Sequence, residues 1–398
     1  MRSDAATPTV RILETPEEVE AAFEVFRIAL VGLPPLPGRA TEISEPGRTF
    51  GGYLDGELVG TAASYTTHVV VPGGARLPHA AVTRVGVLPT HTRRGVARAL
   101  MNAQLSDARQ RGVAIATLRA AEGGIYERYG YGVAGRLEVA AVASRRAVLR
   151  PGVAGGEVVR LARPADAWTL QREIYERIDP SWTGAISRTG EWWTVRRLRV
   201  LDAKQPSMVA VCGPPGAETG YVRYHPAGDE ESVVVDDLVT ADGTARASLL
   251  RYLFSIDLVE TVKFDGLALD DPLRVMLVDE RPVRSESIED EIWLRLVDVG
   301  AALAARTYRG SGEVVVGVVD EVVAPNAGSY WIGAPGAKPT TAEPQLTVDV
   351  AALGAVYLGG TSWRQLAAAG RVTGDLSLVP TADDLFATAT APFCGTFF

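Results

Sequence analysis

The sequence of 398 residues has only two cysteines and four histidines. Cys212 and Cys394 lie far apart, which favours free thiols of a cytosolic protein over a disulfide framework. No two histidines stand at metal-ligand spacing and no Cys-x-x-Cys occurs, so we expect no metal site. The scarcity of histidine also argues against most chemistry that uses an imidazole as acid or base.

A basic excess and a long apolar run are missing too. The chain has 40 basic and 48 acidic residues, a formal net charge of −8, which argues against nucleic-acid binding. Such a negative field attracts cationic small molecules instead. There is no run of about 18 apolar residues and no apolar signal segment, so we expect neither a membrane span nor secretion. We therefore expect a globular, cytoplasmic protein.

Three blocks of secondary-structure signals divide the chain, and its length also predicts two or three domains. The first block, residues 1–150, predicts a helix, a hairpin around Asp55-Gly56, and a right-handed strand–helix–strand unit. The hairpin dipeptide is the strongest of these local signals because both residues tolerate the backbone conformation of a tight turn. The elements are expected at 17–29, 53–71, 82–88, 95–110, 113–118 and 125–129.

The second and third blocks are predicted at residues 151–290 and 291–398. Gly243-Thr244-Ala245-Arg246 in the second block mirrors Gly95-Val96-Ala97-Arg98 in the first, which indicates an internal duplication. In the third block we expect strands, helices and a Pro/Gly-rich loop over residues 324–337. The chain ends on apolar and aromatic residues, which predicts that residues 391–398 pack inside the protein.

The strongest sign of chemistry lies in residues 85–98. A strand runs into a short basic loop and then a helix, so backbone N–H groups and the helix dipole point at one spot. Arg93 and Arg94 add full charges, while Gly95 and Ala97 let an anion approach the backbone. We expect a di- or triphosphate there, and a solvated basic helix start is the alternative. The loop is neither a Walker loop nor a nicotinamide-binding fingerprint.

This segment resembles the acetyl-coenzyme A signature of the GCN5-related N-acetyltransferases (GNATs), Arg/Gln-x-x-Gly-x-Gly/Ala. Thr92 departs from that signature, and the arginines after it supply the charge. In the family, free N–H groups of a splayed strand, here on Val85 and Val87, bind the thioester carbonyl and the pantetheine arm, which is effective electrostatic catalysis. The resemblance implies that acetyl-CoA is bound by Val85, Gly86, Val87, Arg93, Arg94, Gly95, Val96, Ala97 and Arg98.

A second element follows the next strand and resembles the family's Tyr-x-Arg-Phe/Tyr-Gly-Phe/Tyr turn. Acetyl transfer expels a thiolate, and a tyrosine with a reference pKa of about 10 can protonate the sulfur. We therefore assign Tyr126 as the general acid and expect Ala121 and Glu122 to contact the cofactor. Tyr129 and Tyr131 are expected to be core aromatic residues.

The general base is harder to find. The α-carboxylate of Phe398 has a reference pKa of about 3.5, which partial burial raises towards a useful value. If the chain end lies in the active site, this carboxylate can take the proton of the attacking amine. An end that merely packs its aromatic rings is the alternative.

The whole chain resembles the enhanced intracellular survival (Eis) acetyltransferases of actinobacteria. That resemblance implies an α/β (α+β) fold with an active GNAT domain, a degenerate central GNAT domain and a C-terminal domain like sterol carrier protein 2. It also implies a tyrosine acid, a terminal carboxylate base, hexamers, and acetylation of aminoglycosides at several positions. A protein-lysine acetyltransferase and a lipid carrier with a decayed acetyltransferase site are the alternatives.

Several smaller expectations concern the central block and scattered residues. Ala241-Asp242 replaces the arginine pair of the first block, and because aspartate repels a pyrophosphate, we expect no coenzyme A there. We expect Trp192-Trp193 to pack between domains, Asp236-Asp237 to cap or solvate a strand end, and Glu24 and Glu42 to be surface acids.

Overall fold

The computed structural model describes residues 7–398 except 32, 204–205 and 229–230. Its contacts divide the chain into two compact units. Unit 1 contains Met1–Gly135, Trp182–Val195 and Asp290–Phe398, and unit 2 contains Arg136–Ser181 and Arg196–Glu289. Two strands, β6 (Gly132–Ala143) and β12 (Val283–Leu296), pass from one unit into the other. The three domains predicted at 1–150, 151–290 and 291–398 stay a prediction.

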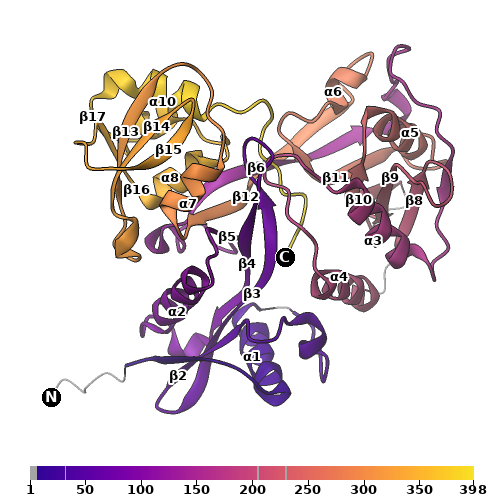
Figure 1. Ribbon diagram of the computed structural model, residues 1–398. Helices are drawn as coiled ribbons and strands as arrows, with labels where there is room; N and C mark the ends of the chain where they lie inside the picture. The colour runs from indigo at the N-terminus through magenta and orange to yellow at the C-terminus, as the bar shows by residue number, and fades with distance from the viewer. Residues whose placement is uncertain (1–6, 32, 204–205, 229–230) are drawn as a thin grey trace. The chain divides into compact units, whose positions relative to one another are not determined.

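The first sheet of unit 1 has the strand order β1-β2-β3-β4-β5-β12 (Figure 1). Its neighbours are antiparallel except for β4 and β5, which are parallel and joined by helix α2. The elements are β1 (Thr9–Ile12), α1 (Pro16–Ala29), β2 (Thr49–Leu54), β3 (Glu57–Val70), β4 (Arg76–Val87), α2 (Val96–Gln110) and β5 (Ile115–Leu118).

Local sequence accounts for the predicted helix and hairpin, and both are confirmed. Helix α1 begins after Thr15, whose side chain accepts the N–H of Glu18 in a capping box. The β2–β3 turn places Asp55 and Gly56 at φ of 54° and 83°. Both residues therefore occupy the left-handed region that a two-residue hairpin turn requires.

Two glycines let helix α2 lie directly on the sheet. A Cβ on Gly52 would lie 2.9 Å from a methyl carbon of Val96, and one on Gly60 would lie 2.6 Å from it. Because a larger residue at either position would push the helix away, these glycines fix where its first turn lies.

The second sheet of unit 1 belongs to the C-terminal part of the chain and has the order β15-β14-β13-β16-β17. The predicted loop over 324–337 is wrong in part, because Gly328–Gly333 and Gly336–Thr340 form a hairpin of β14 and β15. Residues 330–332 are Tyr-Trp-Ile, which favour a strand and outweigh the flanking glycines. The elements are α7 (Val299–Ala305), β13 (Glu313–Val319), β14, β15, β16 (Leu346–Asp349), α8 (Val350–Tyr357), α9 (Trp363–Ala368), β17 (Thr373–Gly374) and α10 (Val379–Phe386).

Unit 2 repeats the strand–helix–strand pattern of unit 1 in a sheet of order β6-β11-β10-β9-β8-β7. Strands β10 and β11 are parallel and joined by α5, as β4 and β5 are joined by α2, so the predicted repetition is visible in the fold. Helix α4 (Gly190–Ala203), which begins in unit 1, was not predicted. The other elements are β7 (Val159–Leu161), α3 (Ala167–Ile178), β8 (Met208–Cys212), β9 (Gly220–Pro226), β10 (Ser232–Thr240), α5 (Gly243–Phe254), β11 (Thr261–Ala268) and α6 (Leu273–Met276).

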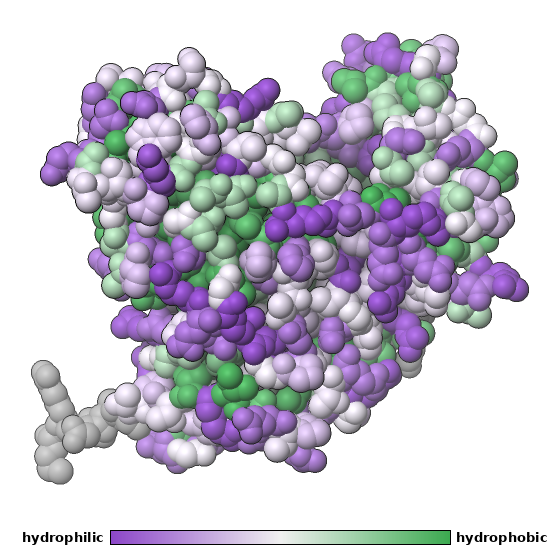
Figure 2. Space-filling view, viewed as in Figure 1, coloured by the Kyte–Doolittle hydropathy of each residue, from purple (hydrophilic) through white to green (hydrophobic). Residues whose placement is uncertain are grey.

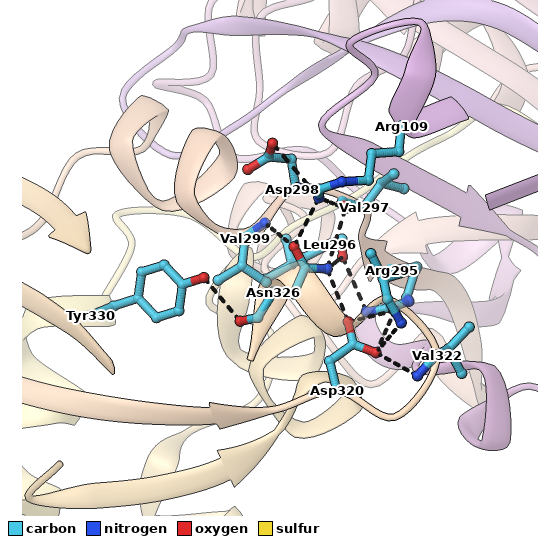
Figure 3. A network of polar contacts seen from close by, with 11 residues as sticks. Arg109, Arg295, Leu296, Val297, Asp298, Val299, Asp320, Val322, Asn326 and Tyr330 are labelled. Atoms are coloured by element: carbon cyan, nitrogen blue, oxygen red, sulfur yellow. Dashed lines mark hydrogen bonds and ion pairs between the residues drawn. The ribbon is translucent and has the colours of Figure 1, made fainter. Parts of the chain in front are cut away.

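A buried polar network ties the C-terminal part of unit 1 to the first sheet (Figure 3). Arg295 on β12 forms a fully buried ion pair with Asp320, at 2.7 Å. Asn326 donates to the same carboxylate and accepts the N–H of Val299. Arg109 at the end of α2 donates to Asn326 at 3.2 Å, so α2, β12 and the loop after β13 share one set of hydrogen bonds.

Hydrophilic residues spread over the face of the molecule shown in Figure 2, interspersed with hydrophobic ones. This matches a composition of 47% hydrophobic and 22% charged residues. Among the residues that the structure describes, no helix has both the length and the hydrophobicity that crossing a membrane requires.

Candidate active site

Strands β4 and β5 separate at one end. Their parallel pairing covers His79–Val82 and Ile115–Leu118, after which β4 continues to Val87. A register shift against β3 marks a bulge at this point, where Arg84 has a φ of 52°. The bulge lies just past the end of β5, and the last residues of β4 have no β5 residue paired with them on that edge.

Two backbone N–H groups near the end of β4 face that free edge. Leu88 donates its N–H to the carbonyl of Val59 on β3, at 2.9 Å. Because N–H groups of an extended strand alternate between its two edges, those of Val87 and Val85 point away from β3. Gly86 lies between them and approaches α1 closely, since a Cβ there would be 2.9 Å from the Cβ of Ala29.

The first turn of α2 presents its N–H groups without a protein cap. Gly95 is the N-cap residue with a φ of 85°, no side chain caps the helix, and its first turn contains no acidic residue. Arg93 also has a positive φ, of 61°. Left-handed residues next to a helix start form a concave set of N–H donors, which is the geometry that binds phosphate.

The side chains of this loop divide into two groups. Arg93, Arg94 and Arg98 are exposed, whereas Val96 is buried against the sheet and offers a ligand only its backbone. Arg94 forms a solvent-exposed ion pair with Asp55 at 3.6 Å, and such pairs are weak enough for a phosphate to displace. The structure thus brings the predicted loop residues together at one open helix end.

The second predicted element follows β5. Ala121 and Glu122 are exposed, and Tyr126 is half-buried at the start of a 3-10 turn, Glu127–Tyr129. The carbonyl of Tyr126 accepts the N–H groups of Tyr129 and Tyr131, at 3.0 and 3.3 Å. Tyr129 and Tyr131 are buried, as expected for core aromatic residues.

The environment of Tyr126 keeps its hydroxyl protonated. Burial, with smaller contributions from Tyr129 and Glu122, raises the pKa of Tyr126 to about 12. Its ring packs edge-on against Tyr131 with 6.2 Å between ring centroids. Within the described part of the chain its hydroxyl makes no hydrogen bond, so it can donate one to a bound group.

Most of the chain end is packed, as the sequence predicts, but Phe397 is exposed. Cys394 is 4% exposed and Thr396 is 1% exposed, and Phe398 is half-buried. The ring of Phe398 lies edge-on to His79 with 6.5 Å between ring centroids. Burial lowers the pKa of His79 to about 3, so this imidazole is a poor base at neutral pH.

Tyr126 and Phe398 lie on opposite faces of the sheet. Phe398 packs against the cluster that contains Ile115 and Leu294, and Tyr126 packs against the cluster that contains Leu118. Side chains of successive residues in a strand point to opposite faces, so Ile115 and Leu118 separate these clusters.

Residues far apart in sequence hold the chain end, and sequence reasoning missed most of them. A segment at residues 182–192 binds the backbone of the last six residues through Trp182, Arg188 and Trp192. Glu291 on β12 accepts two of their N–H groups. Trp192-Trp193 is expected to pack between domains, and Trp192 lies in unit 1, where it donates to the carbonyl of Phe397. The other contacts left no signal in the sequence.

The second block differs at its helix start. The carboxylate of Asp242 accepts the N–H of Ala245 at 2.9 Å and so caps α5. Arg246, which matches Arg98 of the first block, forms an ion pair with Asp271. A carboxylate therefore already caps the start of α5 and accepts one of the N–H groups of a kind that α2 leaves open.

The acidic residues singled out in the sequence are paired. Glu24 binds Arg27 at 2.8 Å and Glu42 binds Arg39 at 2.9 Å, as surface acids on their own elements. The expectation for Asp236 is wrong, because it does not merely solvate or cap a strand end but forms an ion pair at 2.6 Å with a buried arginine of unit 2. Its neighbour in sequence accepts the hydroxyl of a buried tyrosine.

Comparison with known proteins finds three matched domains. An acetyltransferase (GNAT) domain matches residues 10–134, another acetyltransferase (GNAT) domain matches residues 184–296, and a sterol carrier protein domain matches residues 299–395. This order confirms the predicted fold of two GNAT domains followed by a sterol-carrier-like domain.

Similar whole proteins agree with these matches. An uncharacterised N-acetyltransferase of Streptomyces coelicolor is 38% identical over 80% of this chain and 81% of its own. The N-acetyltransferase Eis of Mycobacterium tuberculosis is 32% identical over 83% of this chain and 84% of its own. The crystal structure of Eis1 from Mycobacterium abscessus is 42% identical with a TM-score of 0.90, covering 98% of this chain and 100% of that one.

Proposed function

The chain belongs to the Eis family of GNAT N-acetyltransferases, and from that membership we propose that it acetylates several amines of polycationic small molecules, aminoglycosides among them. Acetyl-CoA-dependent acetyl transfer follows from the family itself. The observation that carries the finer proposal is the chain end, which packs at the splayed strands opposite the phosphate-binding face. This arrangement supports direct attack of an amine on the thioester.

The residues around α2 fit the acetyl donor. We propose that the open N–H groups of Gly95, Val96 and Ala97, with Arg93, Arg94 and Arg98, bind its phosphates. The edge N–H groups of Val85 and Val87 would bind the pantetheine arm and the thioester carbonyl, with Gly86 leaving room beside α1. Ala121 and Glu122 would border the same groove. The donor supplies an activated acetyl group, and residues of the protein bind the donor and transfer the protons.

Two groups of the chain would handle the protons. We propose that the Phe398 carboxylate accepts the proton of the amine and that the Tyr126 hydroxyl donates to the leaving sulfur. A covalent acetyl-cysteine step is disfavoured because burial raises the pKa of Cys212 to about 11 and that of Cys394 to about 12. Both thiols are therefore protonated and poorly nucleophilic at neutral pH.

The substrate class rests on charge and on family resemblance. The net charge of −8 favours polycations over anionic acceptors. A lipid carrier is disfavoured because one continuous buried cluster, including Trp363, Tyr357 and Phe386, fills much of the sterol-carrier-like region. Lysine-type amines of proteins remain the second candidate. By the same resemblance we propose a homo-oligomer, a hexamer, in the cytoplasm.

A thiol-release screen tests this function. Acetyl-CoA turnover should rise when an aminoglycoside such as kanamycin is added and should rise less with a lysine peptide. Mass spectrometry of the aminoglycoside product should show more than one added acetyl group. Turnover with the peptide alone would favour the protein-lysine activity, and no acceptor-dependent thiol release would contradict acetyl transfer to amines altogether.

We also propose that each chain binds one molecule of acetyl-CoA, in unit 1. Titration calorimetry should give a stoichiometry of one per chain, because the Asp242 carboxylate already occupies the helix start of the second block. Replacing Arg98 by Gln should weaken binding, whereas the same change at Arg246, its counterpart in the second block, should not. A stoichiometry of two would contradict the proposal.

A further inference from the structure

The hydrogen bonds from other segments to the last six residues are made mainly to their backbone. Trp182 Nε1 donates to the carbonyl of Phe393 at 2.9 Å, and Trp192 Nε1 donates to that of Phe397 at 2.6 Å. Arg188 donates to the carbonyl of Gly395 at 2.8 Å and to the Thr396 hydroxyl at 3.1 Å. These three residues bind the carbonyl side of the chain end.

Glu291 binds the N–H side. Its two carboxylate oxygens accept the N–H groups of Cys394 and Gly395, at 2.8 and 2.9 Å. Its side chain is 1% exposed, and Arg119 lies 3.7 Å away as its ion-pair partner. A buried carboxylate on two successive amides fixes both their direction and their distance from the strand that carries it.

The strand register places Glu291 at the separation of β4 and β5. On β12, Trp293 pairs with Leu118, the last residue of β5. Glu291 therefore stands two residues beyond the end of β5, where the sheet opens. Arg119, the first residue after β5, lies over the ring of Phe397 with 4.8 Å from its guanidinium carbon to the ring centroid.

The chain end turns at Gly395, next to the amides that Glu291 holds. Gly395 has a φ of 62°, and a Cβ there would lie 2.8 Å from the ring of Phe393. The left-handed conformation is costly for other residues but not for glycine, so the turn occurs at Gly395. The two amides held by Glu291 are those of Gly395 and of the residue before it, so the carboxylate holds the point from which the last three residues are directed.

We propose that Glu291 is a positioning residue that directs the C-terminal carboxylate to the amine, an inference that rests on the proposed role of this carboxylate as base. Glu291 itself does not contact the reacting atoms in this proposal. Its negative charge is needed because an amide side chain has one acceptor oxygen and cannot hold both N–H groups and Arg119.

A double-mutant cycle tests the inference. The four proteins are the wild type, Glu291→Gln, the chain extended by one alanine after Phe398, and the combination. We expect Glu291→Gln to lower kcat by about 10- to 100-fold, the cost of misplacing a catalytic group by about 1 Å, with KM for acetyl-CoA unchanged. The combined protein should be no slower than the extended one, because both changes act on the same carboxylate. Kanamycin, or the best acceptor of the amine screen, is the substrate.

The other possible outcomes of this double-mutant cycle would contradict the inference or the terminal base. If the two effects on kcat multiply, Glu291 acts independently of the chain end and the inference is wrong. An unchanged kcat for Glu291→Gln overturns it as well. If the extension alone has no effect, the terminal base is wrong, whatever Glu291 does. Glu138→Gln is the matched control, since this buried carboxylate binds Arg274 at 2.7 and 2.8 Å in unit 2, and it should keep full activity.

A second variant covers the case in which Glu291→Gln does not fold. Arg188→Lys keeps the charge but cannot hold the Gly395 carbonyl and the Thr396 hydroxyl in one fork. It enters the same cycle, with the same expected lack of additivity with the extension. Additive effects for this variant would contradict positioning by the residues that hold the chain end.

Discussion

Replacing Tyr126 by phenylalanine should lower kcat by about 10²- to 10⁴-fold, the usual contribution of a positioned general acid. The ring and its packing on Tyr131 stay, so only the hydroxyl is lost. The affinity for acetyl-CoA should not change, because the groups proposed to bind its phosphates lie on α2. Steady-state kinetics and titration calorimetry measure the two quantities separately.

The control for this change lies in the same turn. Tyr129→Phe removes the hydroxyl of a buried ring three residues away and should leave kcat unchanged. An unchanged kcat for Tyr126→Phe would remove Tyr126 from the mechanism. A loss of acetyl-CoA affinity parallel to the loss of kcat would assign the hydroxyl to binding instead.

The raised pKa of Tyr126 decides what kind of acid it can be. A phenol with a pKa of about 12 is protonated at every pH at which the enzyme is assayed. Full transfer of its proton to a thiolate with a pKa near 8.5 is uphill by about 3.5 pKa units, on the order of 5 kcal/mol. If Tyr126 is the proposed acid, this pKa favours a hydrogen bond that strengthens as negative charge develops on the sulfur.

The raised pKa of Tyr126 also predicts the pH profile of kcat. Tyr126 loses its proton only as the pH rises through about 12, so the acid form persists from pH 7 to 10. The profile of Tyr126→Phe should then keep the shape of the wild-type profile at a lower level. If kcat of the wild type fell with rising pH below pH 10 and this fall disappeared in Tyr126→Phe, the pKa of Tyr126 would be much lower than its burial implies.

Local signals were sufficient for the elements that carry the cofactor loop. The capping box at Thr15, the Asp55-Gly56 turn and the sequence from Val85 to Arg98 are all short-range patterns, and each predicted element formed. The same reasoning placed an element at residues 125–129 after β5, where the structure has a 3-10 turn at Glu127–Tyr129. Local sequence could not give the bulge in β4, because the bulge depends on pairing with residues of β3 that lie 20 to 25 positions earlier, Ala63 opposite Thr83 and Thr61 opposite Gly86.

The residues around the chain end show the limit of reading a single sequence. Trp182, Arg188 and Glu291 come from segments more than 100 residues before the end that they bind. They do not form a motif with each other or with the chain end, so their spacing does not distinguish them. The hairpin of β14 and β15 was missed for a related reason, since glycine and proline dominated a segment whose strands are short.

Removing the charge of the last carboxyl group should lower kcat by about 100-fold or more, because the amine then has no base to accept its proton. Cys394 makes a clean test possible, since a peptide of five residues from Cys394 to Phe398 can be ligated to residues 1–393 through that cysteine. The carboxamide product keeps the ring of Phe398 and every backbone contact of Glu291, Arg188 and Trp192, and lacks only the charge. The same ligation with the free carboxylate is the matched control and should have full activity, as measured by acceptor-dependent thiol release after refolding. Equal activity of the two products would show that the chain end is held at the splayed strands for packing alone and that another group takes the proton.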